Sequence, residues 1–185
     1  MSEPSDVELV LALKGAADGA SFDQAFCELV RRFERRVRAY CLLRLRSAEL
    51  ARDVAQEVFI AFFKSLPRYE PRASLSTYLI GIARNLCSQQ LRSAKARLSR
   101  ELRSSGGRTN EAKDPAELVD RAEQAVEVAR ALGELPGELR ETVELRVFAG
   151  LSFQEIGEVL GRPRSTVQDW FAEALHALRR ALGGP

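Results

Sequence analysis

Apolar residues along most of this chain recur at spacings of three and four, which is the period of an amphipathic helix. Strand-like alternation is nearly absent, and the prolines stand between the periodic stretches rather than inside them. The pattern therefore predicts an all-α protein. Helices are expected at residues 6–14, 21–46, 48–65, 74–103, 116–132, 137–148, 152–160 and 165–182.

A polar stretch divides this helical pattern into two parts. Residues 102–117 contain a Ser-Ser-Gly-Gly run and an Asp114-Pro115 pair, with almost no apolar residue, and this composition is typical of a linker. The sequence predicts an N-terminal segment at 1–20, a small helical domain at 21–101, the linker at 102–117 and a second small helical domain at 118–185. On composition alone the linker is a flexible tether.

Composition excludes several classes of protein. The 185 residues include one histidine and three cysteines that form no CxxC pair, so neither a zinc finger nor a disulfide framework is expected. No GxSxG, HExxH or Walker-type loop is present, and we expect no catalytic residue, no metal and no cofactor. The longest uncharged run, Ala73–Ala83, is eleven residues, whereas a membrane span needs about 20. A cytoplasmic protein without an export signal is expected.

The net charge of +2 conceals an asymmetry along the chain. Residues 21–110 hold 18 Lys and Arg against 8 acids, whereas residues 141–185 hold 5 against 6. A basic block of this size is the electrostatic footprint of a nucleic-acid partner. Solvated arginine faces on the helices are the alternative, and charge alone does not separate the two.

The second domain contains the sharpest local pattern. Ser152 and Glu155 fit a capping box, Gly161-Arg-Pro163 ends that helix, and a new helix begins at Ser165 or Thr166. Two short helices joined by a turn with glycine have the helix-turn-helix shape, whose second helix enters the major groove. The candidate base and phosphate contacts are Arg164, Ser165, Thr166, Gln168, Asp169 and Ala172. An ordinary helical hairpin, with Gln168 or Asp169 as a local cap partner, is the alternative.

The helix expected at 48–65 has two distinct faces. Its buried side is predicted to be Leu50, Val54, Val58, Ala61 and Phe62, and a second side within about 100° of arc gathers Asp53, Gln56, Glu57 and Ile60. An acidic cluster with one exposed aliphatic residue suggests a docking patch for a basic partner. A plain solvated face neutralised by Arg52 and Lys64 is the alternative, and without other evidence it would be preferred.

The segment around the two prolines mixes basic, hydroxyl and aromatic groups. The loop Pro67–Ser74 and the following helix carry Arg68, Tyr69, Arg72, Ser74, Ser76, Thr77, Tyr78, Arg84 and Asn85. Arginines hold phosphates, aromatic rings stack on unpaired bases and asparagine reads a base edge, so this loop could form a pocket for an extruded base. A turn next to a buried Tyr78 explains the same spacing.

Several motifs together carry a family resemblance. They are Asp53-Val-Ala-Gln56-Glu57-Val-Phe59, Ser76-Thr-Tyr-Leu-Ile-Gly-Ile82-Ala-Arg84-Asn85, Leu135-Pro136, Leu151-Ser-Phe-Gln-Glu155-Ile156 and Ser165-Thr166-Val167. With these motifs in this order over residues 20–183, the chain resembles an extracytoplasmic-function (ECF) sigma factor of bacterial RNA polymerase. The resemblance implies two domains, regions two and four, that bind core polymerase and read the minus-ten and minus-thirty-five promoter elements.

The resemblance also implies roles for individual residues. Asp53, Gln56, Glu57, Phe59 and Ile60 lie on the helix that matches the family's docking helix for the polymerase beta-prime clamp, the beta subunit being a further contact. Arg84 and Asn85 match the minus-ten segment, the Pro67–Ser74 loop matches the base-capturing loop, and residues from Arg162 to Asp169 match the minus-thirty-five turn and helix. The linker would thread the polymerase channel. An anti-sigma protein is a possible partner, and no small-molecule substrate or membrane insertion is implied.

Some positions depart from the family pattern. Tyr78 stands where the family usually has Trp, and Ser88–Arg92 keeps only the basic end of an Asp-x-x-Arg motif. Three expected basic residues of the recognition helix are missing, while Asp169 and Glu173 have appeared. Acids that face phosphates weaken DNA binding, so we expect weak autonomous binding to the minus-thirty-five element. A helix-turn-helix regulator that acts without polymerase and a diverged protein-interaction module are the rival interpretations.

Overall fold

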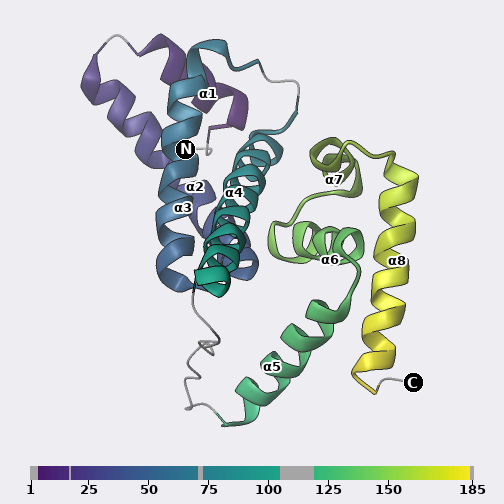
Figure 1. The fold of residues 1–185 in the computed structure, drawn as a ribbon. Helices are drawn as coiled ribbons and strands as arrows, with labels where there is room; N and C mark the ends of the chain where they lie inside the picture. The colour runs from purple at the N-terminus through teal and green to yellow at the C-terminus, as the bar shows by residue number, and fades with distance from the viewer. Residues whose placement is uncertain (1–3, 17, 71–72, 105–118, 184–185) are drawn as a thin grey trace.

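The structure is a computed structural model that describes residues 4–16, 18–70, 73–104 and 119–183. Within these ranges the chain is built from α-helices with two short helical turns and no strand (Figure 1), which confirms the all-α prediction. The elements are α1 (Asp6–Gly15), α2 (Gly19–Leu45), α3 (Ala48–Ser65), the 3-10 turn η1 (Leu66–Arg68), α4 (Leu75–Ser104), α5 (Val119–Glu134), α6 (Gly137–Val143), the π-helical turn η2 (Glu144–Phe148), α7 (Phe153–Leu160) and α8 (Arg164–Ala181).

Side chains and backbone strain explain where several helices begin and end. The Ser47 hydroxyl accepts a hydrogen bond from the Leu50 N–H and so caps α3, while Arg46, at φ 51°, ends α2 in the left-handed conformation. The capping box predicted at Ser152 and Glu155 is present at the start of α7. A second capping box, which was not predicted, is formed by Ser5 and Glu8 at the start of α1.

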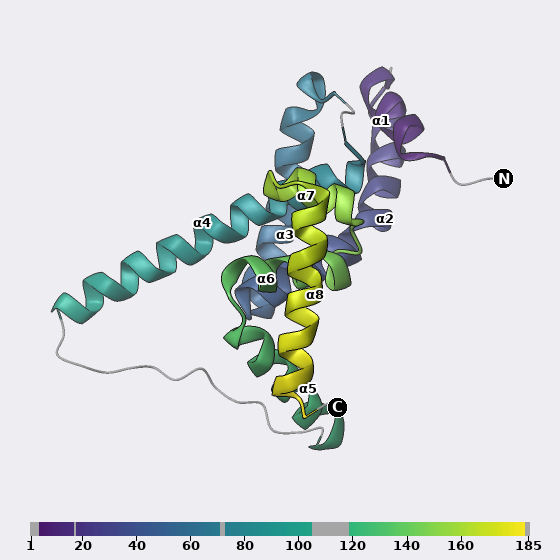
Figure 2. The same ribbon diagram turned by 90° about the vertical axis from the view of Figure 1, so that its right-hand side faces the viewer.

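The first domain is a bundle of α2, α3 and α4, with α1 against α2 (Figure 1). Its centre is filled by fully buried side chains, including Leu29, Tyr40, Val58 and Phe62. The prediction for α3 was correct for Val54, Val58 and Phe62 but wrong for Leu50, which is 45% exposed, and Ala61 is half-buried. Leu50 lies in the first turn of α3, at the end of the helix that follows the Ser47 cap. The C-terminal part of α4 extends beyond the bundle (Figure 2).

The second domain packs α5 and α6 against α8, and α7 against α8 as well. A small core holds the first three together, with buried side chains Leu132, Leu135, Leu139, Val143 and Ala174. The helix expected at 137–148 is interrupted, because after Val143 the backbone continues as the π-helical turn η2. This turn brings Glu144 and Leu145 into buried positions.

The two domains pack directly on one another. Leu145, Leu151, Ile156 and Val167 of the second domain belong to the same buried apolar cluster as the core of the first. Helix α7 contacts α4, and η2 contacts α2 (Figures 1 and 2). The sequence predicted two domains and a tether but not this contact. Helix α4 continues to Ser104, and residues 105–117 of the predicted linker lie outside the described residues.

Candidate functional site

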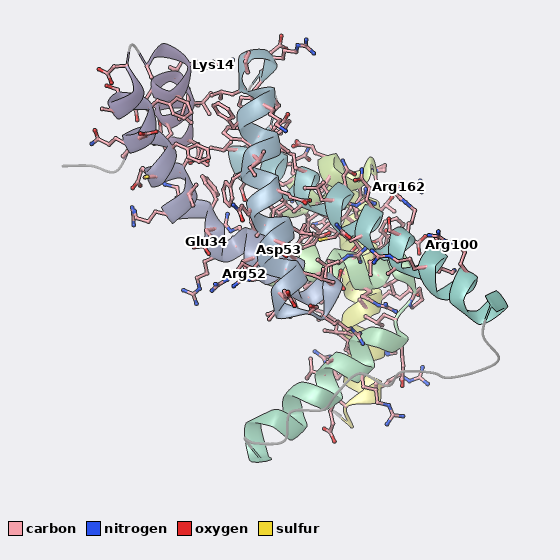
Figure 3. All side chains as sticks on the ribbon, turned by 60° about the vertical axis from the view of Figure 1, so that its left-hand side comes forward. Lys14, Glu34, Arg52, Asp53, Arg100 and Arg162 are labelled. Carbon is pink, nitrogen blue, oxygen red and sulfur yellow. The ribbon has the colours of Figure 1, made fainter. Side chains whose placement is uncertain are left out.

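The acidic face predicted on α3 is exposed as a unit. Asp53, Gln56 and Glu57 are exposed and Ile60 is 44% exposed, while Phe59 from the same predicted set is only 6% exposed. Figure 3 shows Asp53 and Arg52 on the outer side of α3, with Glu34 of α2 nearby. Phe59 therefore shapes this face from beneath, whereas the other four residues are available to a partner.

A groove of about 350 Å³ runs along this face between α2 and α3. Its apolar lining consists of Phe26, Val30, Ala55, Phe59 and Ile60. Charged and polar groups surround it, namely Glu34, Arg38, Arg52 and Gln56. An apolar floor inside a charged rim is the usual construction of a protein-binding surface.

The start of α4 gathers the hydroxyl and aromatic groups that the sequence singled out. The Ser74 hydroxyl caps the helix by accepting from the Thr77 N–H at 3.1 Å. The Tyr69 ring lies in the core, 4.7 Å from the Tyr78 ring and 5.8 Å from the Phe62 ring between centroids, so it is not free to stack on a base in this conformation. Tyr78 is half-buried, whereas the simpler interpretation of the loop expected it to be buried.

The remaining minus-ten candidates divide by exposure. Arg68 and Asn85 are exposed, whereas Ser76 is buried and its hydroxyl accepts a hydrogen bond from Arg36 Nη1 at 2.8 Å. Arg84 is half-buried in an ion pair described below. Arg72 lies outside the described residues.

Helices α7 and α8 form the predicted helix-turn-helix. Gly161 ends α7 in the left-handed conformation, and the Arg162 N–H donates to the Gly157 carbonyl at 2.9 Å. Pro163 then precedes the first residue of α8. Along the polar face of α8, Arg164, Ser165, Gln168, Asp169, Ala172 and Glu173 are exposed, and Thr166 is half-buried.

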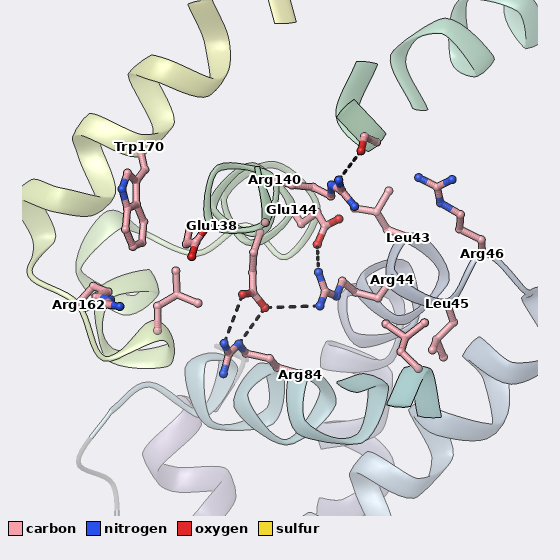
Figure 4. Close-up of a pocket in the computed structure, with 15 residues that line it drawn as sticks. Leu43, Arg44, Leu45, Arg46, Arg84, Glu138, Arg140, Glu144, Arg162 and Trp170 are labelled. Carbon is pink, nitrogen blue, oxygen red and sulfur yellow. Dashed lines mark hydrogen bonds and ion pairs between the residues drawn. The ribbon is translucent and has the colours of Figure 1, made fainter. Parts of the chain in front are cut away.

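Arg162, in the turn between α7 and α8, is held against an aromatic ring of α8. The Arg162 guanidinium lies over the Trp170 ring, 5.8 Å from its centroid (Figure 4), within the range of a cation–π contact. This contact holds a positive charge at the N-terminal end of α8, where a helix entering the major groove meets the backbone. Asp169 and Glu173 lie exposed on the same helix, so the expected acids do face outward.

Comparisons with known proteins agree with this arrangement. The family model for sigma-70 region 2 matches residues 29–97, and the model for sigma-70 region 4 matches residues 125–178. The chain is 32% identical over 181 residues to the ECF RNA polymerase sigma factor SigM of Mycobacterium tuberculosis, covering 98% of this chain and 86% of that protein. The chain belongs to the ECF sigma factor family. It is a sigma factor that directs transcription initiation with RNA polymerase, and sigma factors are generally non-enzymatic regulators.

Two solved structures share the fold of this sigma factor. CnrH, in complex with the cytosolic domain of CnrY, matches with a TM-score of 0.71 and 23% identity over 97% of this chain and 98% of its own. RpoE of Bartonella quintana, in complex with the anti-sigma factor NepR, matches with a TM-score of 0.67 and 22% identity over 86% of this chain and 98% of its own. At these identities the likeness is one of fold.

Charged groups join regions two and four of the sigma factor. Arg84 donates from Nε to Glu141 Oε1 at 2.9 Å and from Nη2 to Glu141 Oε2 at 3.3 Å. Arg44 donates from Nη1 to Glu144 Oε2 at 2.9 Å (Figure 4), and its Nη2 lies 3.8 Å from Glu141 Oε1. Burial raises the pKa of the Glu144 carboxyl, a shift that Arg44 opposes.

These ion pairs border a cavity between the two regions. The cavity measures about 810 Å³ (Figure 4), and its charged lining includes Arg44, Arg46, Arg84, Arg140, Arg162, Glu138, Glu141 and Glu144. A second bridge lies at the start of α4, where Glu155 Oε1 accepts from the Ser74 hydroxyl at 2.5 Å and from the Thr77 hydroxyl at 3.1 Å. None of these contacts could be predicted from local sequence patterns, because the paired groups lie 57 to 100 residues apart.

Two further properties concern ions and membranes. Within the described ranges, no three His, Cys, Asp or Glu side chains are arranged to hold a metal ion. None of the described helices combines the length and the apolar character that a bilayer crossing requires.

Proposed function

We propose that the exposed face of α3 is the surface with which this sigma factor docks on core polymerase. The observation that carries the proposal is the coincidence of Asp53, Gln56, Glu57 and Ile60 with an apolar groove on the outside of region two. The partner is a basic coiled-coil surface of the beta-prime clamp. Apolar contact in the groove supplies affinity, and the acids select for a basic partner.

The double substitution Asp53→Arg and Glu57→Arg tests the docking face. Reversing two exposed charges against a basic partner should weaken core binding by at least about a hundredfold, because like charges across an interface cost several kcal/mol. The fold should be unaffected, since exposed substitutions of this kind change stability by about 0.5 kcal/mol or less. The measurement is a core-polymerase binding titration together with run-off transcription.

A matched control makes the same change in net charge at two acids that lie neither on this face of α3 nor in the lining of the groove. Asp23→Arg with Glu127→Arg alters exposed acids on α2 and α5. This control should bind core polymerase as the unmodified protein does. Equal affinities for the docking variant and the control, both folded, would show that the acidic face is not the docking surface.

Minus-ten recognition falls to α4 and the turn before it. Asn85, exposed on α4, is the base reader, and Arg68, Arg72 and Arg84 hold phosphates. Loss of a base contact changes the sequence preference at one position, whereas loss of a phosphate contact weakens binding to all sequences alike. Transcription from a library of minus-ten variants should therefore distinguish Asn85→Ala from Arg84→Ala, and identical profiles for the two would refute the base-reading role.

Minus-thirty-five recognition falls to the exposed N-terminal part of α8. Gln168 is the base reader, with adenine as its natural partner, and Arg162 and Arg164 are phosphate anchors. With Asp169 and Glu173 exposed on the same helix, binding by region four alone should be weak. Tethering to the polymerase supplies the missing affinity through effective concentration.

Three further assignments complete the proposal. The protein has no enzymatic activity of its own, because the catalysis belongs to the polymerase, and it acts in the cytoplasm with that enzyme. An anti-sigma protein restrains it; RpoE of Bartonella quintana was solved with the anti-sigma factor NepR, and this chain shares its fold. Copurification with core polymerase in growing cells, and with an anti-sigma protein in uninduced cells, is the expected result.

A further inference from the structure

The cavity between regions two and four is lined by more cations than anions. Five arginines and three glutamates contribute to its wall, which leaves an excess of two positive charges when all of them are ionised (Figure 4). Its volume of about 810 Å³ lies within the range of about 300–1,000 Å³ that is typical of small-molecule sites. Leu91, Leu160 and Trp170 add apolar surface to the wall. The cavity thus has the size and the charge of a site for an organic anion.

Ion pairing inside the protein uses only part of this charge. Two of the lining acids pair with two of the lining arginines in the bridge between the regions. Among the residues that the structure describes, the other lining arginines have no acid within ion-pair distance; they are Arg46, Arg140 and Arg162. Glu138 is exposed and likewise has no arginine partner in the described part of the chain. The cavity therefore contains three guanidinium groups and one carboxylate that are available to a ligand.

Two of these arginines meet at Gly133, in the last turn of α5. Arg140 Nη2 donates to the carbonyl groups of Gly133 and Leu135, the latter at 2.8 Å, and these two hydrogen bonds fix its guanidinium. A Cβ at Gly133 would stand 3.4 Å from Arg46 Nη2, so the Arg46 guanidinium reaches the same residue. Like charges gathered at one residue repel each other. A phosphate bound between the two guanidinium groups would remove this repulsion and accept charge-assisted hydrogen bonds from both.

The opposite end of the cavity is aromatic. Figure 4 shows Trp170 and Arg162 at the end away from Arg46. The Arg162 guanidinium lies 5.8 Å from the centroid of the Trp170 ring, and both side chains line the cavity. Aromatic rings and guanidinium planes are the groups on which nucleobases stack. A ligand with phosphates at one end and a flat heterocycle at the other would match both ends.

We propose that this cavity binds a guanine nucleotide, with its phosphates between Arg46 and Arg140 and its base at the end formed by Trp170 and Arg162. The carboxylate of Glu138 selects the base. Guanine presents N–H donors at two adjacent positions, N1 and N2, and an ionised carboxylate accepts from both, whereas adenine presents a single amino group on that edge. The inference goes beyond the docking and promoter roles proposed above and depends on neither.

The test is a calorimetric titration of the full chain with GDP, with tryptophan fluorescence measured in parallel. Trp170 is the single tryptophan of the chain, so a base at its end of the cavity should change the emission. GDP should bind at one site per chain, and ADP about tenfold more weakly or less, because a hydrogen bond to a charged group is lost. Inorganic pyrophosphate should bind more weakly than GDP and leave the emission unchanged. Failure of GDP to bind, or GDP binding with unchanged emission, would overturn the proposal.

Substitution of Arg46 tests the phosphate end. Arg46→Gln removes one charge from an exposed position and should weaken GDP binding by about tenfold or more. Arg35→Gln is the matched control, because Arg35 is exposed on α2, the helix that Arg46 ends, and does not line the cavity. The control should bind GDP as the unmodified protein does. Equal GDP affinities for the two variants would overturn the proposal.

A variant that adds a charge gives independent evidence. Gly137 lines the cavity as the first residue of α6, and a Cβ there meets nothing within 4 Å. An acid in the first turn of a helix is favoured, so Gly137→Asp should fold normally, as thermal unfolding checks, and should weaken GDP binding through repulsion. Unchanged GDP binding in this variant would count against the site.

The base end has its own variant. Glu138→Gln should reduce the preference for GDP over ADP and leave ADP binding unchanged, whereas a retained preference would refute the assignment of guanine. A single-stranded DNA of about 12 nucleotides is the competing ligand. If it binds with a dependence on Arg46 while GDP does not bind, the cavity belongs to a nucleic-acid surface and the proposal fails.

Discussion

Gly157 lies where the turn of the helix-turn-helix folds back against α7, and a single methyl group should disturb it. A Cβ at this position would stand 2.6 Å from the Arg162 carbonyl oxygen and 3.7 Å from the Arg164 nitrogen. The oxygen is backbone, and its residue is held by the 2.9 Å hydrogen bond from the Arg162 N–H to the Gly157 carbonyl. Gly157→Ala can therefore be accommodated only by moving the turn.

The size of the effect follows from two opposed contributions. Alanine is favoured over glycine inside a helix by about 1 kcal/mol, whereas forcing an extra carbon into a packed site costs about 1–3 kcal/mol. Gly81, inside α4, isolates the first contribution, because a Cβ there meets nothing within 4 Å. Gly81→Ala should stabilise the protein by up to about 1 kcal/mol. Gly157→Ala should be less stable than Gly81→Ala by about 1–3 kcal/mol.

The assay is urea unfolding of both variants beside the unmodified protein, with thermal unfolding as a second measurement. For a chain of this length, 1 kcal/mol corresponds to about 2–4 °C in Tm. Gly157→Ala should also weaken promoter binding through α8, because the turn sets how α8 is presented. Equal stabilisation by the two substitutions would refute the reasoning, since it would show that the turn has room for a methyl group.

Three other predictions follow from single groups. The fully buried Tyr40 hydroxyl has no hydrogen-bond partner among the described residues, so Tyr40→Phe should raise the free energy of unfolding, by up to about 1–3 kcal/mol in urea titrations. Desolvation raises the pKa of Glu155, but hydrogen bonds from Ser74, Ser152 and Thr77 together lower it below its usual 4.5. The ionised Glu155 carboxylate therefore stabilises the fold fully above pH 4.5, and this stabilisation is lost as the pH falls through the lower pKa of the folded state. Glu155→Gln should make the free energy of unfolding less dependent on pH between about pH 3 and 5. Glu173→Arg should strengthen binding of the full chain to minus-thirty-five duplex DNA and steepen its salt dependence by about one phosphate contact; no change would show that this acid does not face DNA.

Local rules account for the part of the fold that the sequence predicted. Apolar spacing that ends before Pro67 placed α3 at 48–65, the bounds that the structure has, and the capping box at Ser152 located the start of α7. The same spacing was wrong for Leu50, because periodicity gives the direction of a side chain but not whether a neighbour reaches that end of the helix. It also gave no sign of the π-helical turn at Glu144–Phe148, which packs against α2.

Candidate residues that share one face of one helix could be predicted from the sequence, whereas contacts between different elements could not. The exposed residues of α3 and α8 are adjacent on one helix, so helical geometry alone brings them together. Tyr69 was expected to be accessible to a base, and its burial depends on Phe62 and Tyr78 from two other elements. Likewise, the position of Arg84 in a motif suggested a phosphate contact but gave no sign of Glu141, its partner within the protein, which lies 57 residues away.

The charge asymmetry of the chain is partly explained by contacts between the two domains. The excess of acids in the second domain was first a reason to expect weak DNA binding there. In the structure, Glu141, Glu144 and Glu155 neutralise or cap groups of the basic first domain, and only Asp169 and Glu173 lie exposed on the recognition helix. Three of the six acids of residues 141–185 therefore stabilise the packing of the second domain on the first.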